Sequence, residues 1–297
     1  MADLTAASPV MRFFRAIGLE PVAWALRRLH CPVPAAALVL EVGSGGNPYA
    51  RANVLFDAYV DTRQRHWVPL IVDRPTVLGF VERLPFRDKA FDFVIASHVL
   101  EHSADPERFL GELQRVAKAG YIEVPDAFME RINPYRDHRL EITVRDGRLV
   151  IRKKRGWQED PAVVELYEHE AKPMVARKLI PRHPFAFHVR YYWNDRIDYV
   201  VVNPEDDAAW PAPESASPAV GALSLRGRIG GAVLRLARRV LSQGKRNRAL
   251  SLAPLLACPD CRSAGMEATA DTVRCLGCGR RYPIQQGVPR LYPEGLP

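Results

Sequence analysis

The chain has 297 residues, of which 47% are hydrophobic and 26% are charged, a balance typical of a globular protein with one or two domains. Its apolar runs are too short to span a bilayer, no secretory signal opens it, and four of its five cysteines form CxxC pairs, which indicates metal binding in a reducing compartment. The formal net charge of +8 belongs to residues 221–250, which hold eight basic and no acidic residues, so a general nucleic-acid-binding surface is excluded. We therefore expect a cytoplasmic protein.

The first half of the chain alternates short apolar runs with helical patterns. Residues 10–29 predict two short amphipathic helices, broken near Gly18 and Pro21. A clearer helix follows Asp105, a good N-cap, and Gly120 lies where a helix terminator belongs. Runs typical of buried strands lie at residues 37–42, 54–56, 76–81, 91–96 and 120–124. This alternation predicts an α/β fold with a mostly parallel sheet.

The second half predicts an added β-hairpin, a linker and a small module. Asp146-Gly147 separates two strand-like runs within residues 141–153, which is a strong signal for a two-residue hairpin turn. Residues 203–220 are rich in proline, alanine, serine and acid, which marks a linker. Further strands are expected at residues 187–193 and 197–202. We expect N-terminal helices at 1–36, the α/β domain at 37–203, a linker and basic helix at 204–250, and a cysteine module at 251–297.

A glycine-rich loop follows the first predicted strand. The sequence from Leu40 to Gly46 is LEVGSGG, and its glycines let the backbone pass close to a ligand at the edge of the sheet. The dinucleotide fingerprint needs a glycine where Pro48 stands, and Glu41 would repel a pyrophosphate but suits a cationic ligand. Asp57, at the end of the second strand, is placed to accept hydrogen bonds from ribose hydroxyls.

Further motifs follow in a fixed order: LPFRDKAFD at residues 84–92, SHVLEH at 97–102 and RVAKAGYIEVP at 115–125. With the EVGSG loop and the acid after the second strand, this order resembles class I S-adenosylmethionine-dependent methyltransferases of the small-molecule type. The resemblance covers residues 37–126 and implies a seven-stranded Rossmann-like sheet with S-adenosylmethionine bound over the glycine loop. The cofactor-binding residues that it implies, with the contacts we add, are Glu41, Gly43, Ser44, Gly45, Asp57, Glu82 and Ser97.

The sequence departs from the family pattern in two places. Phe80 stands where the family often has an acid that contacts adenine, so adenine must be bound by stacking, by backbone groups or by Glu82. Only residues 47–53 separate the glycine loop from the second strand, too few for a full crossover helix. We expect the N-terminal helices to cover the sheet face that this short connection leaves thin.

Methyl transfer to a hydroxyl needs a base in addition to alignment of donor and acceptor. His98 and His102 follow the fourth strand and Asp126 follows the fifth, so these three are the candidate catalytic residues. The alternative is that the Glu101-His102 pair is structural. His138 and His188 are more simply explained as surface or packing histidines.

Two CxxC pairs, separated by thirteen residues, form the most specific metal motif in the chain. Four thiolates suit tetrahedral zinc, and a site saturated with protein ligands is structural. A redox dithiol pair is the alternative. The sequence that follows, GRRYPI and GVP, resembles the small zinc-ribbon activator of tRNA, ribosomal-RNA and release-factor methyltransferases, which implies an activator held in cis. The expected zinc ligands are Cys258, Cys261, Cys275 and Cys278.

The basic helix at residues 223–243 has three interpretations: it packs on the catalytic domain, it lies on an anionic membrane, or it contacts RNA. Because aromatic residues are absent from it, nucleic acid is the weaker partner. Two functions follow for the whole chain. It transfers methyl groups from S-adenosylmethionine to a small molecule, glycan or lipid-linked precursor, at the membrane periphery if the helix binds there, or it is a non-catalytic scaffold or RNA-binding module.

Overall fold

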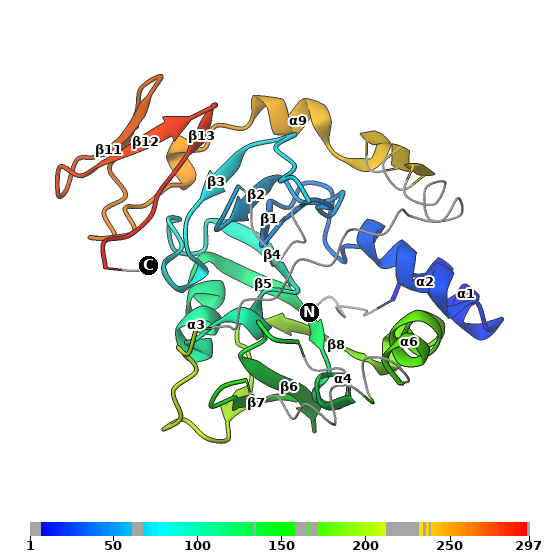
Figure 1. Ribbon diagram of the computed structural model, residues 1–297. Helices are drawn as coiled ribbons and strands as arrows, with labels where there is room; N and C mark the ends of the chain where they lie inside the picture. Colours follow the sequence, from blue (N-terminus) through cyan, green and yellow to red (C-terminus); the bar gives the residue numbers. More distant parts are fainter. Residues whose placement is uncertain are drawn as a thin grey trace. The chain divides into compact units, whose positions relative to one another are not determined.

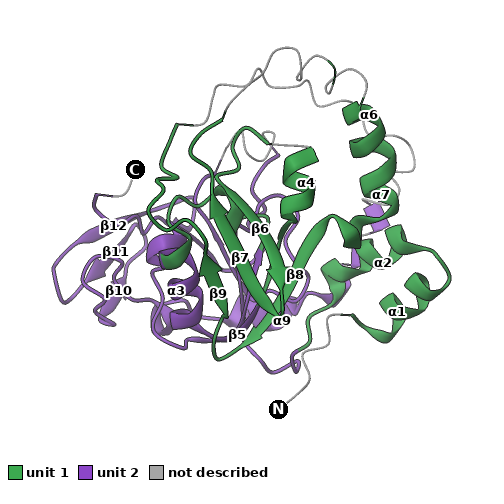
Figure 2. Ribbon diagram, turned by 90° about the horizontal axis from the view of Figure 1, so that it is seen from below, with its two compact units in different colours: residues 1–32, 97–107, 121–216 green, residues 33–96, 108–120, 217–297 purple. Residues whose placement is uncertain are grey.

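The computed structural model describes residues 7–60, 68–132, 135–157, 166, 171–211, 232–233, 236–237 and 239–295. Contacts divide the chain into two compact units, each assembled from several stretches of sequence (Figure 2). Unit 1 comprises residues 1–32, 97–107 and 121–216, and unit 2 comprises residues 33–96, 108–120 and 217–297. The domain boundaries at residues 36, 203 and 250 stay predictions.

Parallel strands form the centre of unit 2 (Figure 1). The strands are β1 (Val39–Val42), β2 (Val54–Asp57), β3 (Thr76–Leu78) and β4 (Phe91–Ser97). Leu40 pairs with Val54 on one side and with Val94 on the other, which sets the register of the sheet. All residues of β1, β2 and β3 are buried, as expected for parallel strands that are covered on both faces.

The full sheet has the order β3-β2-β1-β4-β5-β8, with β5 at Ala117–Pro125 and β8 at His188–Asn194. This order confirms the predicted α/β, Rossmann-like fold, although the described residues contribute six strands to the sheet where the resemblance implied seven. Helix α3 (Pro106–Val116) begins directly after Asp105, as predicted. Gly120 does not end this helix as expected, because β5 starts at Ala117, directly after α3.

The connection from β1 to β2 contains no helix, as its length predicted. Its polar backbone groups are instead bound by two buried side chains. Glu41 accepts a hydrogen bond from the Tyr49 N–H at 2.8 Å, and the Arg74 guanidinium donates to the carbonyls of Tyr49, Ala50 and Ala52. A short loop can therefore replace a crossover helix without leaving these groups unsatisfied.

The C-terminal cysteine module belongs to unit 2. Its four strands form an antiparallel sheet in the order β10-β11-β12-β13, and this sheet with the cysteine cluster confirms the predicted small C-terminal module. The strands are β10 (Met266–Ala268), β11 (Thr272–Cys275), β12 (Arg281–Gln285) and β13 (Val288–Pro289). Before them lie α9 (Gly244–Ala249) and the 3-10 turn η8 (Ala253–Leu255).

The chain after β13 runs along the edge of β3. Arg290 forms a parallel bridge with Leu78, and the Leu291 N–H donates to the Leu78 carbonyl at 2.8 Å. Gly79 makes this approach possible, because a Cβ there would lie 2.9 Å from the Leu291 carbonyl oxygen. On the other flank of the module, Arg262 pairs with the buried Glu112 of α3 at 2.9 Å. The module is thus part of the packing of unit 2.

Unit 1 contains the N-terminal helices and the predicted hairpin. The hairpin strands are β6 (Leu140–Arg145) and β7 (Arg148–Lys153), and β9 (Tyr199–Val201) pairs in parallel with β7. Asp146 and Gly147 have positive φ angles of 51° and 76°, as the predicted turn requires. The helices and turns of unit 1 are α1 (Pro9–Ala16), α2 (Glu20–Leu26), η1 (Arg27–Leu29), η4 (Leu100–His102), α4 (Ala127–Ile132), α6 (Lys172–Met174), η6 (Val175–Leu179), α7 (Ile180–Arg182) and η7 (Pro184–Ala186).

The N-terminal pattern is confirmed with one correction. Gly18 separates α1 from α2 at a φ of 76°, but Pro21 does not interrupt a helix, because it lies in the first turn of α2, where proline needs no N–H partner. Arg27 of η1 anchors this segment by a buried ion pair with Glu123 of β5. None of the helices in the described part of the chain is long and apolar enough to cross a membrane.

Candidate functional site

The glycine loop of unit 2 and the acid after β2 contact each other. Gly43 and Gly45 have positive φ angles of 65° and 56°, a conformation that favours glycine. The Gly45 N–H donates to the Asp57 carboxylate at 2.9 Å, and the Ser44 N–H donates to the Phe56 carbonyl at 3.1 Å. Gly45 and Asp57, which were predicted separately, are therefore linked by a hydrogen bond at the carboxyl ends of β1 and β2.

One polar atom of this loop is buried without a partner. Among the described residues, the Ser44 hydroxyl forms no hydrogen bond, although Ser44 is only 3% exposed. Asp57 is 6% exposed, and its second oxygen accepts from the Tyr59 N–H at 3.2 Å. The Ser44 hydroxyl and the Asp57 carboxylate together suit a polar ligand with hydroxyl and charged groups. Such a ligand would give the buried Ser44 hydroxyl the hydrogen bond that it lacks.

The chain itself covers one side of the same loop. The Ile71 N–H donates to the Gly45 carbonyl at 3.0 Å, and a Cβ on Gly46 would lie 2.3 Å from the Val68 side chain. Glu41 has a structural bond to Tyr49 in addition to its predicted role. A cofactor on this loop must therefore approach Gly43, Ser44 and Asp57, away from Val68.

Three aromatic rings gather beside the loop that follows Asp57. Phe80 lies between Tyr59 and Tyr292, with ring centroids 6.1 Å and 5.3 Å away. The Tyr292 hydroxyl donates to the Ala58 carbonyl at 2.7 Å. Phe80 thus sits in an aromatic group where the family pattern has an acid, while Glu82 lies in the 3-10 turn η3 (Val81–Arg83). Tyr292 was not among the predicted site residues, because only folding brings it close to Ala58, which is far away in the sequence.

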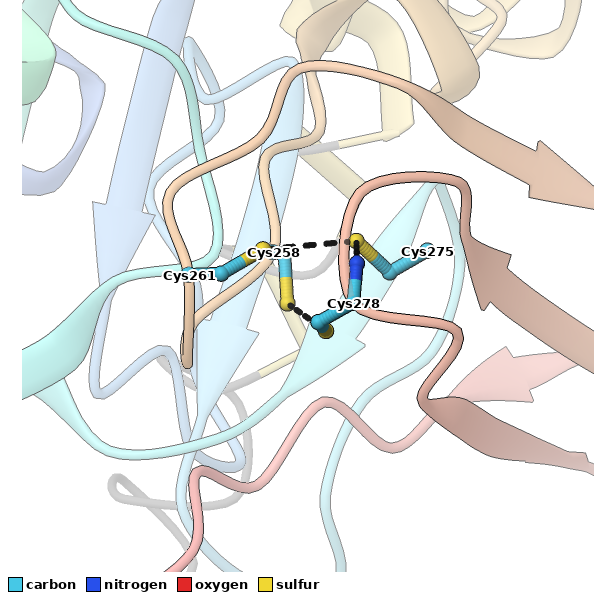
Figure 3. A group of neighbouring side chains, drawn as sticks. All are labelled: Cys258, Cys261, Cys275 and Cys278. Atoms are coloured by element: carbon cyan, nitrogen blue, oxygen red, sulfur yellow. Dashed lines mark hydrogen bonds between the residues drawn. The ribbon is translucent and has the colours of Figure 1, made fainter.

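The four predicted zinc ligands form one cluster. Their sulfur atoms all lie within 4.8 Å of one another, and no disulfide joins them (Figure 3). Cys258 Sγ is 3.8 Å from Cys278 Sγ, and Cys261 Sγ is 3.5 Å from Cys275 Sγ. Four sulfurs around one zinc at ~2.3 Å have edges of about 3.8 Å, so the observed spacing fits a tetrahedral ion. Tyr282 and Asp260 support the cluster, since the Tyr282 hydroxyl lies 3.1 Å from Cys258 Sγ and donates to Asp260.

A completely buried carboxylate, Glu123 of β5, is the charged centre of unit 1. It accepts hydrogen bonds from Arg27 at 2.8 and 3.0 Å, from the Ser97 hydroxyl at 3.0 Å and from the Tyr121 hydroxyl. Arg190 of β8 lies 4.0 Å away and binds the same tyrosine. Burial favours the neutral acid, but His98 and Arg27 outweigh it and hold the pKa of Glu123 well below its ordinary value. Glu123 was not predicted as a site residue, although an acid inside an apolar strand is a sign of a buried charged group.

His98, a predicted catalytic residue, lies against this carboxylate. Its backbone has a positive φ of 58°, and its ring nitrogens lie 3.4 Å from Glu101 and 3.4 Å from Glu123. Burial disfavours its charged form, but the two carboxylates outweigh this and raise its pKa to about 9. His98 therefore carries a proton at neutral pH. The ring of His188 lies 5.4 Å away, and burial together with the charge of His98 lowers its pKa to about 4.

The other predicted catalytic residues lie elsewhere in unit 1. Both oxygens of Asp126 are already engaged, since one accepts from the Phe128 N–H at 2.8 Å and the other from the Thr143 hydroxyl at 2.7 Å. Asp126 therefore stabilises the start of α4. His102 Nδ1 lies 3.2 Å from the Asp137 carbonyl, and burial lowers the pKa of His102. The catalytic and cofactor roles of the individual residues stay predictions.

Comparison with known proteins supports the family rather than a substrate. Residues 55–122 match the family model described as a methyltransferase domain. An uncharacterised methyltransferase of Mycobacterium leprae is 32% identical over 149 residues, which cover 44% of this chain and 53% of the relative. The chain thus spans about half the length of the curated relative it matches.

Two solved structures share a more distant likeness. One is a complex between the Haloferax volcanii Trm112 methyltransferase activator and a putative methyltransferase, with 16% identity, a TM-score of 0.35 and coverage of 63% of this chain and 92% of that chain. The other is a putative methyltransferase from an antibiotic biosynthesis pathway of Anabaena variabilis, with 20% identity, a TM-score of 0.29 and coverage of 43% and 53%. From the matched segment and the sheet order, the chain carries a domain of the class I S-adenosylmethionine methyltransferase type.

Proposed function

We propose that this protein transfers a methyl group from S-adenosylmethionine to a small molecule, a glycan or a lipid-linked precursor. The observation that carries the proposal is the contact between the Gly45 N–H and Asp57, beside the unpartnered Ser44 hydroxyl. The carboxylate of Asp57 accepts ribose hydroxyls, the Ser44 hydroxyl binds the polar part of the cofactor, and the rings around Phe80 stack on adenine. The bound cofactor supplies the reactive methyl group as a sulfonium.

The candidate catalytic residues His98 and Asp126 differ in their suitability as a general base. His98 is protonated at neutral pH, so it acts as a charged group that orients or donates rather than as a base. Each oxygen of Asp126 accepts one hydrogen bond, as each oxygen of Asp57 does, so both carboxylates are held in place and keep a lone pair on each oxygen. Because the charged His98 cannot accept a proton, we base the proposal on alignment of donor and acceptor, which contributes roughly 7–11 kcal/mol.

Calorimetric titration of the full chain with S-adenosylmethionine tests the proposal. We expect saturable binding in the wild type and a loss of at least about tenfold in affinity for Asp57→Ala, since hydrogen bonds to a charged group contribute about 1.5–3 kcal/mol. Asp88→Ala is the matched control, because the Asp88 side chain is 78% exposed on the same unit. No binding by the wild type at millimolar cofactor would refute the enzymatic proposal.

The same titration separates the enzyme from the alternative, a non-catalytic scaffold. One observation favours the scaffold: Val68 packs against Gly46 and Ile71 binds Gly45, so the chain covers part of its own glycine loop. If this cover fills the cofactor position, wild type and Asp57→Ala give equally flat titrations. If the cofactor binds beside it, only the wild type gives a saturable curve.

We propose further that the four cysteines bind zinc and that the module is an activator joined in cis to the enzyme. The spacing of the sulfurs suits zinc, and the segment after β13 brings Tyr292 to the aromatic group. The ion supplies folding energy to a module too small for a sufficient apolar core.

The basic segment 223–243 lies mostly outside the described residues, and its contact with an anionic membrane is a proposal from its sequence. Each basic residue near such a surface contributes about 1 kcal/mol. We expect the protein to sediment with vesicles that contain anionic lipid, and replacement of Arg235, Arg238 and Arg239 by glutamine to weaken this binding strongly. Arg145→Gln, on the exposed end of the hairpin, is the control. Binding to RNA but not to vesicles would favour nucleic acid instead.

A further inference from the structure

Three side chains that can ligate a metal converge in unit 1, away from the cysteines. Glu101 and His102 lie in η4, and His138 lies just before β6. One ligand atom from each lies within 4.8 Å of the other two. The Arg139 N–H donates to the Glu101 carbonyl at 2.7 Å, which fixes the two segments together. Glu101 and His138 are only 2% and 7% exposed, whereas the His102 side chain is 19% exposed, so the cluster is mostly buried and open to solvent at one member.

Both histidines are held in the orientation that metal-binding histidines need. His138 Nδ1 lies 2.7 Å from a carboxylate oxygen of Glu130, and His102 Nδ1 lies 3.2 Å from the Asp137 carbonyl. A carboxylate and a carbonyl only accept hydrogen bonds, so each Nδ1 carries the proton. In the neutral form of each ring, Nε2 then has a lone pair, and this is the tautomer that outer partners impose on histidine ligands of metals.

The carboxylate of Glu101 provides an independent observation. Among the described residues, neither of its oxygens accepts a hydrogen bond, although both are buried. Its nearest charged partner is His98, whose Nδ1 lies 3.4 Å from Oε1. A buried carboxylate without hydrogen bonds is costly, and a cation between this carboxylate and the two Nε2 atoms removes that cost.

We propose that Glu101, His102 and His138 bind one divalent transition-metal ion, for which two imidazoles and one carboxylate best suit zinc. The proposal goes beyond methyl transfer and does not depend on it. Three protein ligands leave a coordination position open, as in catalytic rather than structural sites. That position accepts an oxygen donor, such as a water or a hydroxyl group of a ligand, and favours its ionised form. Glu130 and Asp137 are positioning residues that orient the two rings.

The opposing interpretation is a buried hydrogen-bonded cluster without a metal. Lys154 also contacts Glu130, and His98 already neutralises part of the charge of Glu101. On that interpretation the same contacts only stabilise unit 1, and a divalent ion finds no site there. Counting bound ions on the full chain distinguishes the two cases.

The test is a Co²⁺ titration of the metal-depleted full chain. Cobalt at four thiolates gives intense charge-transfer bands, whereas cobalt at two histidines and a glutamate gives only weak visible bands, so the two clusters are counted separately. We expect one equivalent with thiolate bands and one equivalent without them per wild-type chain, corresponding to the two clusters. A wild type that binds only the thiolate equivalent overturns the proposal, whatever any variant does.

The variants assign the second equivalent to its ligands. Glu101→Gln keeps the shape of the side chain and His138→Ala removes a ring, and each is expected to lose the equivalent without thiolate bands. His183→Ala is the matched control, since that side chain is 56% exposed and lies outside the cluster. Retained thiolate bands report that unit 2 is folded, and the near-ultraviolet circular dichroism of each variant reports on unit 1. If folded Glu101→Gln binds as many ions as the wild type, the proposal is wrong.

Discussion

Cys258→Ser is expected to unfold the C-terminal module and to weaken S-adenosylmethionine binding on the order of tenfold. Cys258 is fully buried in the cluster, and a structural zinc ion contributes about 10–16 kcal/mol to the folding of small zinc modules. The module carries Tyr292, whose ring lies 5.3 Å from that of Phe80. Its loss would remove one of the rings that we propose to stack on adenine, and base stacking on an aromatic side chain contributes ~1–3 kcal/mol.

Limited proteolysis and calorimetry measure the two effects separately. Cys31→Ser is the matched control, because Cys31 lies in unit 1 and takes no part in the four-cysteine cluster. A zinc chelator added to the wild type is expected to reproduce the Cys258→Ser result. The expectation is wrong if the module of Cys258→Ser resists protease as the wild type does. If the module of Cys258→Ser is unfolded but the variant binds the cofactor as tightly as the wild type does, Tyr292 has no role in cofactor binding.

Glu123→Gln is expected to destabilise unit 1 by about 3–5 kcal/mol, the usual result of removing one partner from a buried charge pair. The substitution leaves the buried charge of Arg27 and the partly exposed charge of His98 against a neutral amide. Its amide group also presents hydrogen-bond donors to side chains that are themselves donors. The bond that anchors the N-terminal helices to β5 is weakened at the same time.

Urea unfolding followed by circular dichroism measures this loss. Glu107→Gln is the control, because Glu107 is 43% exposed and pairs with Lys153 at 3.4 Å, and surface pairs contribute only about 0–1 kcal/mol. Arg27→Ala should act on the same cluster, so its effect should not add to that of Glu123→Gln. Equal midpoints for Glu123→Gln and Glu107→Gln would show that the cluster contributes little stability.

Local sequence patterns were sufficient for most of the sheet. The five apolar runs became β1 to β5, and Asp146-Gly147 became the expected turn, because parallel strands and hairpin turns leave a signal in neighbouring residues. The prediction that Gly120 ends the helix was wrong for a physical reason. A glycine after a helix usually ends it, but α3 had already ended at Val116 and the next strand had begun.

The candidate sites were harder to predict, because their contacts join distant parts of the chain. The glycine loop and the CxxC pairs were recognised from residues close together in sequence. The surroundings of Glu123 come from η1, β4, β5 and β8, and no local pattern shows that they meet. His138 was explained as a packing histidine, because its partners Glu130 and Glu101 become apparent only when α4, η4 and β6 are folded together.

The pairing of Leu291 with Leu78 has a kinetic consequence. Strand β3 forms one edge of the six-stranded sheet, and its partner lies far along the chain, so this contact forms late in folding. Until the module has folded and docked, that edge offers unpaired backbone groups to other chains. If the module folds around zinc as we propose, the supply of zinc during synthesis should set how much newly made protein aggregates, independently of the stability that the finished protein attains.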